Sequence, residues 1–138
     1  MSGQPLILVV EDNEANQLLA RAVLEREGYE VDVAGSPVEA LDRLSRRVPD
    51  LILMDIQLPG QDGLSLTRQL KTSPATADIP VVALTAHAMR GDREQSFKAG
   101  CAGYIAKPID TRTLGEQVRG FLASSTAGEH GLNQAATA

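Results

Sequence analysis

Acidic residues follow two of the most apolar runs in the sequence. Glu11 and Asp12 come directly after Leu6–Val10, and Asp55 ends the run Leu51–Asp55. Three carboxylates held close together repel one another unless a cation or a shared proton offsets their charge. A cluster of oxygen ligands suits a hard metal ion, and Mg²⁺ is the ion we expect. Taken singly, each carboxylate could instead cap a turn or a helix.

A hydroxyl and an ammonium follow two later apolar runs. Thr85 ends Val81–Thr85, and Lys107 follows Gly103–Ala106. If the chemistry is phosphoryl transfer to a carboxylate, Asp55 is the nucleophile. Thr85 would then donate a hydrogen bond to a phosphoryl oxygen, and Lys107 would supply positive charge. Alone, Lys107 would be read as a surface lysine and Thr85 as a β-branched strand residue, so their joint placement is what favours function.

The same chemistry assigns a ligand set to the metal ion. Asp12, Asp55 and the backbone carbonyl of Gln57 would bind Mg²⁺ directly, and Glu11 would act through a bound water. The backbone N–H of Ala86 would bind a phosphoryl oxygen, and the small side chain of this residue would leave the approach open.

The order of the remaining segments predicts an α/β fold. Strands are expected over residues 6–10, 29–34, 51–55, 81–85 and 103–106. Helices are expected over residues 14–27, from residue 37, over 64–71 and 90–99, and from Asp110 or Thr111 to about Leu122. Right-handed crossovers between parallel strands then give a doubly wound sheet with helices on both faces. Ligands bind at the carboxyl ends of such strands, where the candidate residues fall.

Composition predicts one domain. The 138 residues carry a net charge of −5 and one cysteine, Cys101, which we expect to be a small core residue. We assign residues 1–5 to a leader, 6–123 to the domain and 124–138 to a disordered tail or linker. The sequence has no basic stripe for nucleic acid, no apolar run of membrane-spanning length and no signal peptide, so a cytoplasmic protein is expected.

The expected first helix carries two apolar stripes. The first stripe consists of Leu19, Ala20, Val23 and Leu24, and the second of Ala15, Leu18 and Ala22. One stripe must face the sheet. The other either widens the buried face or docks a helix of a partner protein.

With these features the sequence resembles the receiver domain of two-component response regulators, over about Leu6 to Leu122. The matching motifs are VVEDNEAN, LILMDIQLPGQDG, ALTA and YIAKPI. Leu58 departs from the family, which more often has Met there. The sequence is most similar to stand-alone receivers of the cell-cycle type and to receivers of hybrid histidine kinases. This resemblance implies a flavodoxin-like (βα)5 fold with strand order 2-1-3-4-5.

The resemblance also implies a function. A histidine kinase or histidine phosphotransfer protein would pass a phosphoryl group to Asp55 in the presence of Mg²⁺. The domain would catalyse only its own phosphorylation and dephosphorylation. Thr85 would move toward the phosphate and Tyr104 would swing inward, which would remodel a face that binds a downstream protein. In the similar receivers the first helix docks the phosphodonor, which favours a docking role for Ala15, Leu18 and Ala22.

Other functions are compatible with parts of the pattern. An aspartyl phosphatase on a similar sheet usually has a second Asp two residues after the nucleophile, where Gln57 stands here. A receiver-like module that binds a partner without phosphorylation commonly lacks one of the site residues, and all are present here. The sequence is also compatible with one domain of a larger kinase, with residues 124–138 as linker.

Overall fold

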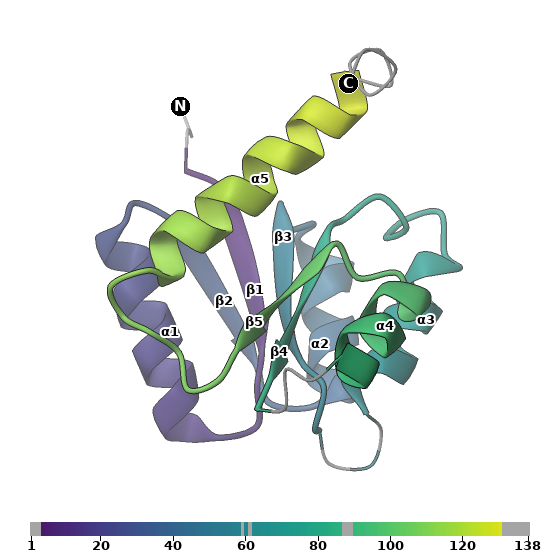
Figure 1. The fold of residues 1–138 in the computed structure, drawn as a ribbon, viewed down its shortest axis with the longest axis horizontal. Helices are drawn as coiled ribbons and strands as arrows, with labels where there is room; N and C mark the ends of the chain where they lie inside the picture. The colour runs from purple at the N-terminus through teal and green to yellow at the C-terminus, as the bar shows by residue number, and fades with distance from the viewer. Residues whose placement is uncertain (1–3, 59, 61, 87–89, 131–138) are drawn as a thin grey trace.

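The computed structural model describes residues 4–58, 60, 62–86 and 90–130 of the chain, in which five strands alternate with five helices (Figure 1). The elements are β1 (Leu6–Val10), α1 (Glu14–Arg26), β2 (Glu30–Ala34), α2 (Pro37–Arg46), β3 (Leu51–Asp55), α3 (Gly63–Lys71), β4 (Val81–Thr85), α4 (Arg90–Ala99), β5 (Gly103–Ala106) and α5 (Leu114–His130). The alternation expected from the sequence is confirmed.

The five strands form one parallel sheet in the order β2-β1-β3-β4-β5. The three central strands are buried along their whole length, as strands covered on both faces must be. Asp55 pairs with Leu84, and Thr85 pairs with Ala106. This register brings the carboxyl ends of β3, β4 and β5 level at one edge of the sheet.

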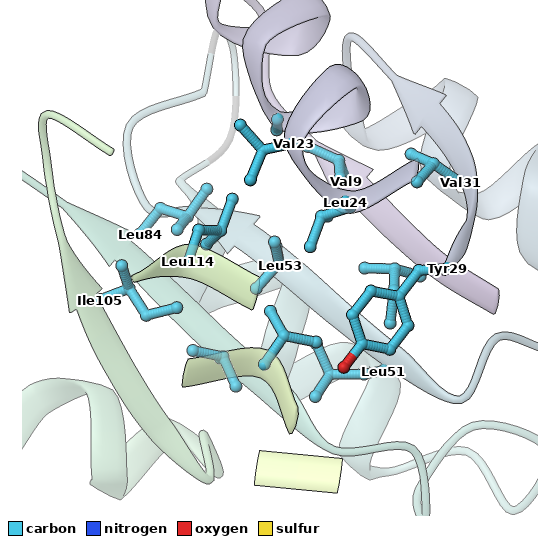
Figure 2. Close-up of a cluster of buried hydrophobic side chains, with 14 residues drawn as sticks. Val9, Val23, Leu24, Tyr29, Val31, Leu51, Leu53, Leu84, Ile105 and Leu114 are labelled. Carbon is cyan, nitrogen blue, oxygen red and sulfur yellow. The ribbon is translucent and has the colours of Figure 1, made fainter. Parts of the chain in front are cut away.

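Two apolar clusters hold the helices against the two faces of the sheet. On one face, Leu24 of α1 and Leu114 of α5 pack against Val9 and Leu53, as Figure 2 shows. On the other, Leu44 of α2 and Leu66 of α3 belong to a cluster that also contains Met54 and Cys101. Helix α4 lies beside α3 and against β5. The burial of Cys101 agrees with the role expected for it.

Polar side chains start three of the helices. Asn13, Ser36 and Asp62 precede α1, α2 and α3, and each side chain accepts a hydrogen bond from the backbone N–H three residues later. Gly28 follows α1 with a φ of 96°, a conformation that residues with a Cβ rarely adopt. These local signals fix where α1, α2 and α3 begin and where α1 ends.

The last helix differs from the expectation. It begins at Leu114, whose N–H donates to the carbonyl oxygen of Asp110, and it continues to His130 rather than ending near Leu122. Its final turns project beyond the sheet (Figure 1). No proline interrupts residues 122–130, so nothing in the backbone chemistry forces the helix to stop. Residues 124–130, which the sequence assigned with 131–138 to a disordered tail or linker, thus belong to α5, and residues 131–138 lie outside the described residues.

The length and apolar character of a helix decide whether it can cross a membrane. Across the described residues, no helix combines enough length with enough apolar character to cross a bilayer.

Candidate functional site

The predicted site residues meet at the carboxyl edge of the sheet. Glu11 directly follows β1, Asp55 ends β3, Thr85 ends β4 and Lys107 directly follows β5. Because these strands are parallel and adjacent, residues far apart in sequence converge at one edge. The backbone N–H of Lys107 donates to the carbonyl oxygen of Thr85 at 2.7 Å, which joins the ends of β4 and β5.

Three carboxylates form the floor and rim of the site. One oxygen of each of Glu11, Asp12 and Asp55 lies within 4.8 Å of the others. Glu11 and Asp55 are only 1% and 3% exposed, whereas Asp12 is exposed. The site therefore has two acids at its base and one at its opening, with oxygen ligands of the kind that Mg²⁺ binds. This is the cluster expected from the sequence.

Lys107 lies between the two buried acids. Its Nζ donates to Asp55 Oδ2 at 2.9 Å and forms an ion pair with Glu11 Oε1 at 3.1 Å. Burial alone would lower the pKa of Lys107, but the neighbouring carboxylates of Asp55 and Glu11 outweigh burial and raise that pKa above its usual value. The ammonium is therefore firmly protonated and offsets part of the negative charge.

Glu11 Oε1 is a buried atom with unused capacity to accept a hydrogen bond. Among the described residues, no donor reaches it with hydrogen-bond geometry, so its contact with Lys107 is an ion pair. A buried oxygen of this kind is costly unless an ion or water completes its surroundings. The donor set and this oxygen fit a bound cation with coordinated water.

Backbone N–H groups orient both buried carboxylates. The N–H of Asn13 donates to Glu11 Oε2 at 3.0 Å, and the N–H of Gln57 donates to Asp55 Oδ1 at 2.9 Å. The contact observed for Gln57 thus uses its backbone N–H, while the predicted use of its carbonyl stays a prediction. The contact of Asp55 caps the turn that follows it, which is the alternative role that its residue type allowed, and it leaves Asp55 Oδ2 to Lys107.

Thr85 and Ala86 occupy the expected positions beside the cluster. Thr85 is buried at the end of β4, and Ala86 is exposed directly after it. Ala86 and Lys107 line a hollow of about 240 Å³ together with Asn16, Pro108 and Ile109. The small side chain of Ala86 therefore borders open space next to Lys107. Its role in leaving the approach to the phosphoryl site open stays a prediction.

The first helix presents the two stripes as two faces. Ala20, Val23 and Leu24 are buried, and Leu19 lies at the margin of that face, 37% exposed. The second stripe, made of Ala15, Leu18 and Ala22, lies outside the buried face, and Leu18 is 61% exposed. The second stripe therefore does not widen the buried face. Its docking role stays a prediction.

The family of the chain follows from sequence comparison. Residues 7–119, which carry every residue of the acidic site, match the response regulator receiver domain. The chain belongs to this family. Receivers are signalling domains of two-component systems and not enzymes in the usual sense. The family binds Mg²⁺ at an acidic site and interacts with histidine kinases or phosphotransfer proteins.

Individual relatives agree with the family. The receiver is 44% identical over 119 residues to the polar-differentiation response regulator DivK of Brucella ovis, covering 86% of this chain and 97% of that protein. It is 36% identical to the receiver domain of sensor histidine kinase PA1611 of Pseudomonas aeruginosa, with a TM-score of 0.79 over 88% of this chain and 99% of that one. That structure has magnesium coordinated in its active-site cleft.

A third comparison concerns the fold. A CheY-like receiver domain protein of Methanospirillum hungatei is 28% identical, with a TM-score of 0.82 over 91% of this chain and 99% of that one. The flavodoxin-like fold and the strand order expected from the resemblance are thereby confirmed.

Proposed function

We propose that this receiver accepts a phosphoryl group on Asp55 from a phosphohistidine of a histidine kinase or phosphotransfer protein. A bond forms between an Asp55 carboxylate oxygen and phosphorus while the phosphorus–nitrogen bond of phosphohistidine breaks. The imidazole nitrogen keeps the electron pair of that bond and takes up a proton. The observation that carries the proposal is the buried Asp55 carboxylate, 2.9 Å from the Lys107 ammonium and clustered with two further acids.

The acidic cluster supports Mg²⁺ as the cofactor of this transfer. Asp12, Asp55 and the Gln57 carbonyl would bind the ion directly, and Glu11 would act through a bound water. Bound Mg²⁺ offsets the negative charge of the phosphoryl oxygens and keeps the attacking and leaving atoms in line. Glu11 Oε1 is paired with Lys107 but accepts no hydrogen bond from the described residues, which supports the water-linked role, because a water on the ion could donate to it.

Lys107, Thr85 and Ala86 would bind the phosphoryl group once it arrives. Phosphorylation removes the charge of the Asp55 carboxylate and places new charge on the phosphoryl oxygens. The Lys107 ammonium, now 2.9 Å from Asp55 Oδ2, would then contact a phosphoryl oxygen instead. The Thr85 hydroxyl and the Ala86 N–H would donate to the other oxygens. The same groups would assist only this domain's own phosphorylation and dephosphorylation.

Signalling would follow from a shift between two packings of one chain. Movement of Thr85 toward the phosphate would open space for Tyr104 to swing inward, and the surface around β5 would change shape. The output partner would be another protein that binds the changed surface. The cytoplasmic location expected from the sequence stays a prediction.

The exposed stripe of α1 supports a docking site for the phosphodonor protein. Ala15, Leu18 and Ala22 lie on the helix that begins beside the acidic site, and a helix of a partner could pack on them. Leu18→Asp should slow transfer from the donor protein and leave phosphorylation by acetyl phosphate unchanged. Val38→Asp, at a similarly exposed valine of α2, is the matched control. Slowing of both reactions by Leu18→Asp would contradict the docking role.

Intact mass spectrometry tests the central proposal. The protein and Asp55→Asn are incubated with acetyl phosphate, each with and without Mg²⁺. The expected result is the gain of one phosphoryl group that requires both Asp55 and Mg²⁺. No gain under any condition would overturn the proposal and favour a module that binds its partner without phosphorylation.

A further inference from the structure

Arg93 of α4 contacts Tyr104 of β5 in two ways. Its Nη1 donates a hydrogen bond of 3.3 Å to the phenol oxygen of Tyr104. Its guanidinium carbon also lies 5.7 Å from the centroid of the same ring, within the range of a cation–π interaction. A single arginine thus engages both the tip and the face of the tyrosine.

The Tyr104 ring is held from two sides. It is half-buried and packs at the margin of the apolar cluster that contains Met54, Leu66 and Ala83. Arg93 is exposed, so the phenol oxygen meets the guanidinium at the protein surface. Apolar packing therefore anchors the base of the ring, whereas the position of the hydroxyl depends on Arg93.

The ring position also shapes the surface beside it. Tyr104 and Arg93 line a hollow of about 320 Å³ together with Glu94 and Phe97. Phe97 is 53% exposed, so the hollow has an apolar wall open to solvent. Inward movement of Tyr104 would break both contacts with Arg93 and remove one wall of this hollow.

We propose that Arg93 is a positioning residue that holds Tyr104 in its surface position and so opposes the switch to the phosphorylated state. This inference rests on the proposed function, because it assumes that phosphorylation favours inward Tyr104. A contact made in only one of two states shifts the equilibrium between them by its full strength. For an exposed cation–π pair this amounts to about twofold to fivefold.

The sign of the effect separates positioning from simple charge. Beryllofluoride, an anionic mimic of the phosphoryl group, should bind more tightly to Arg93→Ala by about twofold to fivefold, because the competing state has lost its contact. If Arg93 acted only through its positive charge, its loss would weaken binding of the anion instead. Arg93→Lys retains the charge and N–H donors but not the planar group, so its affinity should lie between those of the natural sequence and Arg93→Ala.

The experiment measures Mg²⁺-dependent beryllofluoride affinity and the ¹⁹F NMR signals of 3-fluorotyrosine in the same proteins. The chain has only two tyrosines, and Tyr104→Phe assigns the signal of Tyr104. Before ligand is added, the Tyr104 signal of Arg93→Ala should already lie nearer its ligand-bound position. Lys98→Ala, which removes another exposed cation of α4, should match the natural sequence in both measurements.

The two proposals can fail separately. Unchanged or weaker beryllofluoride binding by Arg93→Ala, with normal binding by the natural sequence, would overturn the role of Arg93 and leave the proposed function intact. Absence of binding by the natural sequence, or equal binding by Asp55→Asn, would overturn the proposed function and the role of Arg93 with it.

Discussion

Gln17 donates a hydrogen bond of 2.6 Å from its side-chain amide to the backbone carbonyl oxygen of Glu11. The contact ties α1 to the end of β1, directly beside the acidic cluster. The contact therefore links the loop that carries Glu11 and Asp12 to α1, which is the helix that carries the exposed apolar stripe.

Loss of this contact should weaken metal binding more than folding. In Gln17→Ala the loop after β1 is less restrained, and we expect Mg²⁺ affinity to fall by about tenfold. This is the lower end of the loss in affinity that is typical when a residue that orients metal ligands is removed. Isothermal titration calorimetry with Mg²⁺ measures this affinity. Asn16→Ala, one residue earlier in the same helix, is the control. Equal affinities in the two variants would contradict the link.

Removal of Lys107 should destabilise the metal-free protein. Lys107→Met leaves Glu11 and Asp55 without their cation. We expect the free energy of unfolding to fall by about 2 kcal/mol, less than for a fully buried pair because the ammonium is partly exposed. Mg²⁺ should restore more stability to this variant than to the natural sequence. Urea unfolding with and without Mg²⁺ tests this, with Lys98→Met as control, and an equal loss in both conditions would argue against it.

Gly63 lies against the backbone of Asp55 and Ile56. A Cβ at this position would meet the carbonyl oxygen of Asp55 and would lie 2.8 Å from Ile56 Cα. Because backbone atoms cannot yield cheaply, we expect Gly63→Ala to cost roughly 2 to 3 kcal/mol of stability and to reduce phosphorylation.

Gly120 provides the opposite case. It lies inside α5, and a Cβ at this position would have no heavy atom within 4 Å beyond its own helix backbone and chain neighbours. Gly120→Ala should therefore stabilise the protein by roughly 0.5 to 1 kcal/mol, since alanine loses less conformational freedom in a helix. Thermal unfolding of both variants measures the difference, and similar changes in the two would mean that steric contact at Gly63 is not decisive.

Cys101 should contribute a pH-dependent part of stability. Burial raises the pKa of its thiol to about 11, against smaller opposing effects of Thr67 and Lys71. The unfolded thiol loses its proton from about pH 8.5. Stability due to the neutral thiol is therefore complete below about pH 8.5 and falls as the pH rises toward 11.

Urea unfolding across this alkaline range checks the effect. Cys101→Ala should show a shallower loss of stability with rising pH than the natural sequence. The raised pKa of Lys107 adds a loss in the same direction, but only above about pH 10.4, where the unfolded lysine begins to lose its proton. If the free energy of unfolding of the two proteins fell in parallel between about pH 8.5 and about pH 10.4, this would contradict the contribution of Cys101.

Two arginines cover the outer edge of β2. Arg21 donates to the carbonyl oxygen of Val31 at 3.1 Å, and Arg43 donates to that of Val33 at 3.2 Å. These carbonyls would otherwise be open to another strand. The double variant Arg21→Ala/Arg43→Ala should therefore self-associate more strongly in analytical ultracentrifugation.

A matched control separates this effect from the loss of charge. Arg46 and Arg47 form exposed ion pairs with Asp42 and Glu30. Arg46→Ala/Arg47→Ala removes the same charge without uncovering the β2 carbonyls, and it should stay monomeric to higher concentration. Equal association of both double variants would point to charge alone.

The layout of the site could be predicted from the order of residues alone. Apolar runs that end in Asp55 and Thr85, or just before Glu11 and Lys107, indicated parallel strands, and parallel strands bring such ends to one edge. The types of residue then indicated an acidic metal site with a cation beside it. The order of the strands came from resemblance to a family, because local patterns do not specify which strands are neighbours.

The side-chain contacts around this site became visible only in the folded chain. Lys107 bridges Glu11 and Asp55, and Gln17 reaches Glu11. Arg93 reaches Tyr104, and α5 continues past Leu122. Each side-chain contact depends on strand register, helix placement and rotamer together. A periodic pattern tells which face of an element is buried, but it does not tell which distant atom a polar side chain will meet.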